Sequence, residues 1–131
     1  MNRRTLILSA TAFALAPLSA LANMIDYTPG SAEAAINAGE TVFVDFAADW
    51  CSTCRSQERT INALRQANPA YDAAITFYRV DWDDYGRGDL ATSLNIPRRS
   101  TLVMFRGGVE VGRLVAGTRE GDIRALLDAG L

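Results

Sequence analysis

The sequence predicts an α/β fold, with a central β-sheet flanked by helices on both faces. Short runs rich in Val, Ile, Leu and Phe alternate with amphipathic stretches along most of the chain. Residues 41–47 (TVFVDFA) are nearly all apolar, which is typical of a central strand buried on both faces. Gly107 and Gly108 follow another apolar run and indicate the turn of a hairpin.

The same patterns place the other elements. Residues 75–80 and 101–105 are expected strands, and residues 109–115 alternate apolar and polar side chains as an edge strand does. Expected helices cover residues 32–38, 52–66, 90–94 and 119–129. Ser31 and Thr118 are the expected N-caps, and Gly39 and Gly130 the expected C-terminal glycines. The acidic run Asp81, Asp83 and Asp84 predicts a solvated loop, because calcium binding requires a longer loop of oxygen ligands.

Length and composition predict one soluble domain. The chain has 131 residues, of which 49% are hydrophobic and 21% charged, so a core of ordinary size can form. All 13 basic residues are Arg and none is His, which excludes a lysine Schiff base and histidine chemistry. The net charge of -2 leaves no basic surplus for a nucleic-acid partner. We expect neither a metal nor an organic cofactor.

The N-terminus reads as a signal peptide covering residues 1–22. Arg3 and Arg4 precede an apolar stretch over residues 5–18, and Ala20-Leu21-Ala22 is a small-x-small cleavage pattern. The apolar stretch is shorter than the ~20 residues of a spanning helix, so cleavage is favoured over a retained anchor. We expect a mature domain over residues 23–131, exported to the periplasm or a similar compartment and free of the membrane. Arg3-Arg4 also resembles a twin-arginine export signal.

Cys51 and Cys54, the only cysteines, carry the predicted chemistry. They stand two residues apart, directly after the apolar strand and at the start of a predicted helix. The partial positive charge and free N–H groups of a helix N-terminus stabilise a thiolate on Cys51, which is expected to be the better exposed. Cys54, one turn later, can then attack Cys51 and resolve a mixed disulfide. A structural disulfide, an inert buried pair and a zinc site are the alternatives, the last requiring two carboxylate ligands.

The stretch over residues 42–55 (VFVDFAADWCSTCR) resembles the active-site strand and helix of thioredoxins. The downstream block over residues 100–108 (STLVMFRGG) resembles the same family, and the likeness covers residues 26–131. The sequence around the cysteines is also similar to that of the thioredoxin-like domain of periplasmic DsbD-type reductases. The resemblance implies a thioredoxin-like fold with a mixed sheet and a thiol:disulfide oxidoreductase.

Two further roles follow from this resemblance. Asp45 matches the buried carboxylate that takes the proton of the resolving thiol, and burial in an apolar strand would raise its pKa as this role requires. Its alternative is a polar residue paired with Arg79. Trp50 matches the indole that shields the disulfide and meets the substrate, and its alternative is simple core packing.

The chain departs from the family where thioredoxins have a cis-proline. Aligning Thr101 and the strand after it puts Ser100 at that position, whereas using Pro97 would shift the strand register by three residues. The bond before Ser100 is then expected to be trans, since a non-proline cis bond costs about 2.5–4 kcal/mol. The Ser100 hydroxyl can donate toward Cys51. We also hypothesise that Arg98 or Arg99 points at the site and lowers the Cys51 pKa, against the alternative of two solvated arginines.

The predicted function is reduction, rather than oxidation, of protein disulfides, with electrons supplied by a membrane-bound thiol reductase. Ser52-Thr53 lies where the family tunes the reduction potential, and it matches neither the Gly-Pro of reducing members nor the Pro-His of strong oxidants. A dedicated relay to one client, such as a cytochrome-maturation or metallochaperone protein, and a non-catalytic binding module are the rival functions. The polar run over residues 55–59 predicts that the first half of the helix is exposed.

Overall fold

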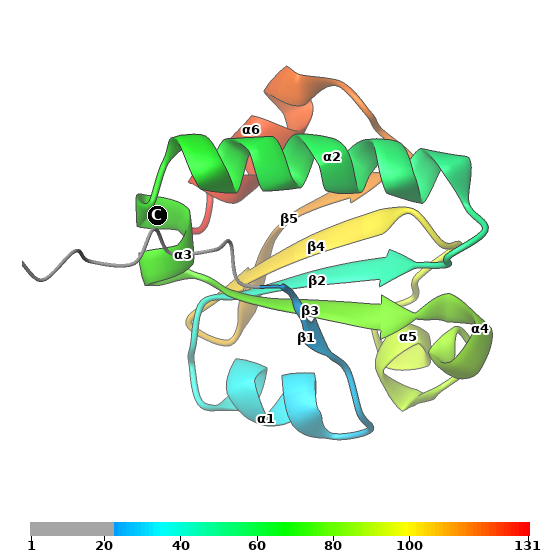
Figure 1. Cartoon of the computed structure of the whole chain (residues 1–131). Coiled ribbons are helices and arrows are strands. Elements are labelled where there is room, and N and C mark those ends of the chain that lie inside the picture. Colours follow the sequence, from blue (N-terminus) through cyan, green and yellow to red (C-terminus); the bar gives the residue numbers. More distant parts are fainter. Residues whose placement is uncertain (1–22) are drawn as a thin grey trace, which may run out of the picture.

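The described part of the chain, residues 23–131 of a computed structural model, is built on a five-stranded mixed sheet (Figure 1). The predicted signal peptide, residues 1–22, lies outside the described residues. The strand order is β1-β3-β2-β4-β5, so β2 is central. β1, β3 and β2 run parallel, whereas β4 is antiparallel to β2 and β5 to β4. The strands are β1 (Ile25–Asp26), β2 (Val42–Ala47), β3 (Thr76–Asp81), β4 (Thr101–Arg106) and β5 (Val109–Val115).

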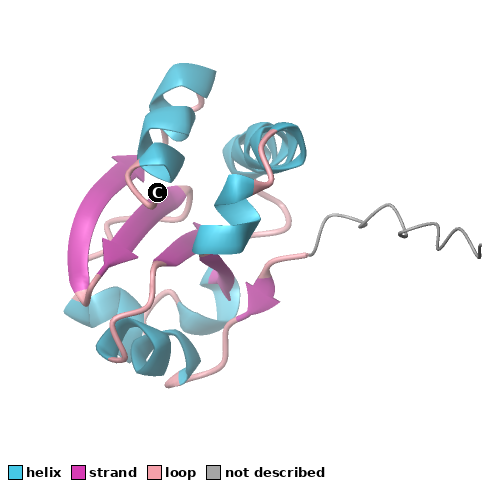
Figure 2. Ribbon diagram, turned by 90° about the vertical axis from the view of Figure 1, so that its left-hand side faces the viewer, coloured by secondary structure: helices cyan, strands magenta, loops and turns pink. Residues whose placement is uncertain are grey.

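Residues 23–131 form six helices. These helices cover the two faces of the sheet (Figures 1 and 2). The helices are α1 (Ser31–Asn37), α2 (Ser52–Ala67), α3 (Ala70–Ala74), α4 (Trp82–Tyr85), α5 (Asp89–Ser93) and α6 (Glu120–Asp128). Helices α2, α3 and α6 lie on one face, and α1, α4 and α5 lie on the other. The predicted α/β architecture is confirmed.

The alternation of side chains along β2 divides the core into two layers. Val42, Val44 and Phe46 pack on the face covered by α1 and α5, whereas Phe43 packs against α2 and α6. All six residues of β2 are buried, as the apolar run predicted. Asp45 falls on the same side of the strand as Phe43, and therefore faces α2.

Three elements were not predicted. β1 has two residues, too few to show the alternation of apolar and polar side chains that predicts a strand. It is a strand because it pairs with β3. Helix α3 follows Pro69 within a polar stretch. Helix α4 replaces the predicted acidic loop, because the Asp81 carboxylate accepts hydrogen bonds from the N–H groups of Asp83 and Asp84 and caps a short helix.

Both predicted N-caps were wrong by one residue. Gly30, with a φ of 90°, is the N-cap of α1, and the Ser31 hydroxyl instead donates to the carbonyl of Thr28. Arg119 is the N-cap of α6, without a side-chain cap, so Thr118 lies outside the helix. Within residues 23–131, no helix has the length and apolar character needed to cross a membrane.

Candidate active site

The turn from β2 into α2 brings the two cysteines together. Cys51 is the N-cap of α2, and its Sγ accepts a hydrogen bond from the N–H of Cys54 at 3.1 Å. The two residues form a disulfide, with their Cα atoms 5.2 Å apart. The same N–H would stabilise a Cys51 thiolate once the disulfide is reduced, because a hydrogen bond to the charged form lowers a pKa.

Both cysteines are covered, which corrects the expectation that Cys51 is the better exposed. Cys51 is 2% exposed and Cys54 is 3% exposed. They pack with Ala47 and Ala48, and the partly buried Trp82 packs against this cluster. The sequence pattern predicted the start of the helix, but it did not show which neighbouring residues bury the two cysteines.

Ser100 lies directly against the disulfide. Its Oγ is 3.1 Å from the Sγ of Cys51 and 3.1 Å from the Sγ of Cys54, and the residue is fully buried. Its N–H donates to the carbonyl of Phe46 at 2.7 Å, which fixes it beside the end of β2. No peptide bond in residues 23–131 is cis, so the bond before Ser100 is trans, and Ser100 has a φ of 63°. Pro97 lies three residues earlier, outside β4.

Asp45 is buried beneath α2. Burial raises the pKa of Asp45 to about 7; the positive charge of Arg79 lowers this pKa, and the charge of Glu58 raises it. Arg79 is not its ion-pair partner, as one alternative proposed, because the guanidinium binds the carboxylate of Asp49 at 2.9 Å. Among the described residues, Asp45 Oδ1 has no hydrogen-bond partner. At neutral pH this carboxyl group can therefore both accept and release a proton.

Asp45 lines a pocket of about 330 Å³. Glu58, one helical turn after Cys54, lines this pocket together with Asp45 and Arg79. The buried carboxyl group therefore lies next to a polar space through which protons can exchange. The pocket is lined by Asn23, Met24, Asp26, Asp45, Glu58, Asn62 and Arg79.

Trp50 stands on the surface beside the pair, which contradicts the alternative of core packing. It is 58% exposed, and its indole Nε1 donates to both carboxylate oxygens of Asp83 at 3.1 Å. The guanidinium of Arg99 lies over the ring, 4.5 Å from its centroid. Arg99 therefore contacts Trp50, and its neighbour Arg98 donates to the carbonyl of Arg99.

The other predicted site residues surround this centre. Ser52 is exposed and Thr53 half-buried in the first turn of α2. Thr101 is buried, and its hydroxyl donates to the carbonyl of Arg98 at 2.7 Å, which closes the loop before β4. Thr101 therefore shapes the loop.

Gln57 is a site residue that was not predicted from the sequence. It is fully buried, so the prediction of an exposed first half of α2 is wrong at this position. Its Nε2 donates to the carbonyls of Ser100 at 3.0 Å and Gly117 at 2.9 Å. The helical period would have revealed it, since the buried stripe of α2 reads Cys54, Gln57, Ile61, Leu64.

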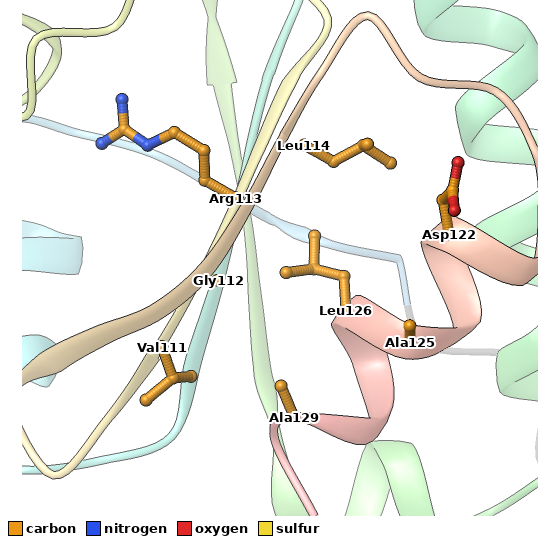
Figure 3. A pocket seen from close by; sticks show the side chains of 8 residues that line it. All are labelled: Val111, Gly112, Arg113, Leu114, Asp122, Ala125, Leu126 and Ala129. Atoms are coloured by element: carbon orange, nitrogen blue, oxygen red, sulfur yellow. The ribbon is translucent and has the colours of Figure 1, made fainter.

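A second hollow lies between β5 and α6 (Figure 3). It has a volume of about 310 Å³ and is lined by Val111, Gly112, Arg113, Leu114, Asp122, Ala125, Leu126 and Ala129. Neither cysteine is among them, so this groove is separate from the sulfur site. Within residues 23–131, no group of three or more His, Cys, Asp or Glu side chains is arranged to hold a metal ion.

Known proteins are similar to this chain in sequence and in fold. A family model for thioredoxin matches residues 24–129. A thioredoxin of Echinococcus granulosus is 32% identical over 97 residues, covering 74% of this chain and 84% of that protein. Thioredoxin-1 of Saccharomyces cerevisiae is 32% identical over 88 residues, covering 67% and 80%. The solved structure of Trxlp from Edwardsiella tarda EIB202 superimposes with a TM-score of 0.66 at 30% identity, covering 82% of this chain and 98% of that one.

We predict that Asp45→Asn makes the stability of the oxidised protein less dependent on pH. Native Asp45 holds its proton up to a pKa of about 7, whereas the unfolded chain loses it near the ordinary value of 3.8. Between these values only the unfolded chain is ionised at this position, so the stability of the fold falls as pH rises. At about 1.4 kcal/mol per pH unit, the upper limit of this loss is roughly 4 kcal/mol. Urea unfolding at pH 4, 6 and 8 should show the variant gaining on wild type as pH rises.

The control for this experiment is Asp122→Asn, which removes an exposed carboxylate of α6. Its difference from wild type should stay nearly constant across the same pH values. A constant difference for Asp45→Asn as well would contradict the raised pKa.

We predict that Arg99→Ala raises the pKa of the Cys51 thiol in the reduced protein by about half a pH unit, because a partly screened positive charge contributes about 1 kcal/mol or less. The dependence of alkylation rate on pH measures this pKa. Arg106→Ala, at the far end of β4, is the matched control. Equal pKa values in wild type and Arg99→Ala would remove the hypothesis that Arg99 activates Cys51.

Proposed function

The chain belongs to the thioredoxin family and is a thiol:disulfide oxidoreductase, and we propose that it reduces disulfides of exported proteins through Cys51 and Cys54. One observation carries the assignment of the pair. The Cys51 sulfur accepts the N–H of Cys54 at the start of α2 and is in disulfide contact with Cys54. This is the arrangement that stabilises an attacking thiolate and keeps a resolving thiol within reach.

The proposed reaction begins with the reduced pair. The Cys51 thiolate attacks one sulfur of a substrate disulfide, so that a mixed disulfide forms and the first substrate sulfur leaves as a thiolate. Cys54 then loses its proton and attacks the Cys51 sulfur, which releases the second substrate sulfur. The substrate gains two electrons and the pair becomes a disulfide again.

Asp45 is the proposed proton acceptor for Cys54. Support comes from its burial on the α2 face of β2 and from its pKa of about 7, which lets it take a proton at neutral pH. The pocket shared with Glu58 would then pass the proton to solvent. The released substrate thiolates take up protons from solvent, and Asp45 returns to its starting charge once the Cys54 proton has left.

The reducing direction rests on the thioredoxin-like frame, and export rests on the signal pattern in residues 1–22. A membrane-bound thiol reductase is the proposed electron donor, because an oxidising compartment does not keep such a pair reduced by itself. Ser52 and Thr53, which lie between the two cysteines, are proposed to set the reduction potential of the pair.

A dedicated relay to one client is the second candidate function. The low exposure of both sulfurs favours it, since a partner must displace a covering group before it can reach Cys51. A non-catalytic binding module has no such support, because the pair is in disulfide contact.

We predict that the protein catalyses the reduction of insulin by dithiothreitol, and that Cys51→Ser abolishes the activity while Cys54→Ser accumulates a mixed disulfide. Turbidity measures insulin reduction, and mass spectrometry detects the trapped substrate. In glutathione buffers the reduction potential should lie nearer thioredoxin's value of about -270 mV than DsbA's of about -120 mV. A redox-active pair that leaves insulin untouched would instead support the relay, and a potential near the DsbA value would reverse the direction.

We predict that the full chain, expressed in a bacterium with a periplasm, is recovered there with Asn23 as its first residue. The apolar stretch and the Ala20-Leu21-Ala22 pattern are the features that export and cleavage require. Fractionation and N-terminal sequencing measure the outcome, and a chain without residues 2–22 is the control. Recovery of the uncleaved chain in the cytoplasm would contradict export.

A further inference from the structure

Gln57 is a buried polar residue that the proposed reaction does not use. It lies in the second turn of α2, on the stripe that faces the sheet and includes Cys54. Both protons of its amide nitrogen are engaged, one by the carbonyl of Ser100 and the other by the carbonyl of Gly117. A flipped amide would set its oxygen against two carbonyl oxygens, so this orientation is the only favourable one.

We propose that Gln57 is a positioning residue of the redox site, which clamps the backbone of Ser100 so that the Ser100 hydroxyl bridges the two sulfurs. The inference deepens the proposed function and rests on it. It assigns to one side chain of α2 the task of setting the loop opposite the disulfide.

The backbone of Ser100 needs such a clamp. A φ of 63° is unfavourable for a residue with a Cβ, and such a residue stays there only when its surroundings hold it. Its N–H is held by Phe46 at 2.7 Å, and its carbonyl is held by the N–H of Ala116 at 2.9 Å and by Gln57 at 3.0 Å. A proline could supply neither this φ nor the N–H, so the loop takes its shape from these three bonds.

Gln57 also joins the parts of the site. Its two bonds connect α2 to the loop before β4 and to the loop before α6, across 43 and 60 residues of sequence. Gln57 and Cys54 lie on one face of α2. The same helix therefore positions both the Ser100 hydroxyl, through Gln57, and the sulfurs of the cysteine pair. The distances of 3.1 Å from Ser100 Oγ to each sulfur follow from this coupling.

The clamp has a chemical consequence in the reduced protein. A hydroxyl has one proton, so Ser100 can donate to only one sulfur at a time, and the charged Cys51 thiolate is the stronger acceptor. Such a bond favours the thiolate and lowers the Cys51 pKa. Loss of the clamp should therefore act on Cys51 in the same way as loss of the hydroxyl.

The test is a double-mutant cycle on the reduced full-length protein, with Gln57→Leu, Ser100→Ala and the double variant. The pH dependence of Cys51 alkylation gives the thiol pKa. We expect each single variant to raise this pKa by about 1 pH unit, and the double variant to raise it no further than Ser100→Ala alone. Gln66→Leu replaces the other glutamine of α2, which is exposed, and should leave the pKa at the wild-type value.

A wild-type Cys51 pKa in folded Gln57→Leu, or fully additive effects in the double variant, would overturn the proposal. If Gln57→Leu does not fold, Gln57→Met is titrated in its place. In the wild type, the side-chain amide protons of Gln57 should also exchange with solvent at least about tenfold more slowly than those of Gln66, and equal rates would overturn the clamp. The titration does not depend on turnover, so a protein that fails to reduce insulin but shows the coupled pKa shifts would refute the proposed function alone.

Discussion

The hydrogen bonding of Ser100 is the constraint on which the rest of the site depends. Its N–H and carbonyl tie the end of β2 to the loop before α6, and its hydroxyl touches both sulfurs. A proline ring would stiffen this loop from within. Here the loop is shaped from outside, by backbone groups and by Gln57, so the geometry around the disulfide depends on the packing of α2 against the sheet.

Burial and activation oppose one another at the cysteine pair. Removing the sulfurs from water raises the pKa of a thiol, whereas the N–H of Cys54 and the hydroxyl of Ser100 favour the thiolate. The same cover restricts which groups can reach Cys51. Trp50, exposed and held by Asp83 and Arg99, lies on the surface directly before this covered pair.

The raised pKa of Asp45 depends on the fact that Arg79 forms its ion pair with Asp49. That guanidinium binds Asp49 near the surface, so no ion pair compensates the buried carboxylate and desolvation dominates its pKa. Glu58 adds a like charge from the helix above. A buried carboxyl group with a pKa of about 7 that faces α2 is suited to the proposed proton transfer from Cys54.

Local patterns were enough to predict the α/β frame, the hairpin at Gly107-Gly108, and a cysteine pair at a helix start, since period, turn residues and spacing are properties of neighbouring residues. Tertiary structure alone decided that the sulfurs are covered, that Arg79 pairs with Asp49, and that β1 is a strand. It also decided the role of Gln57, whose partners lie 43 and 60 residues away. Such contacts depend on how separate elements pack, and no local period encodes that packing.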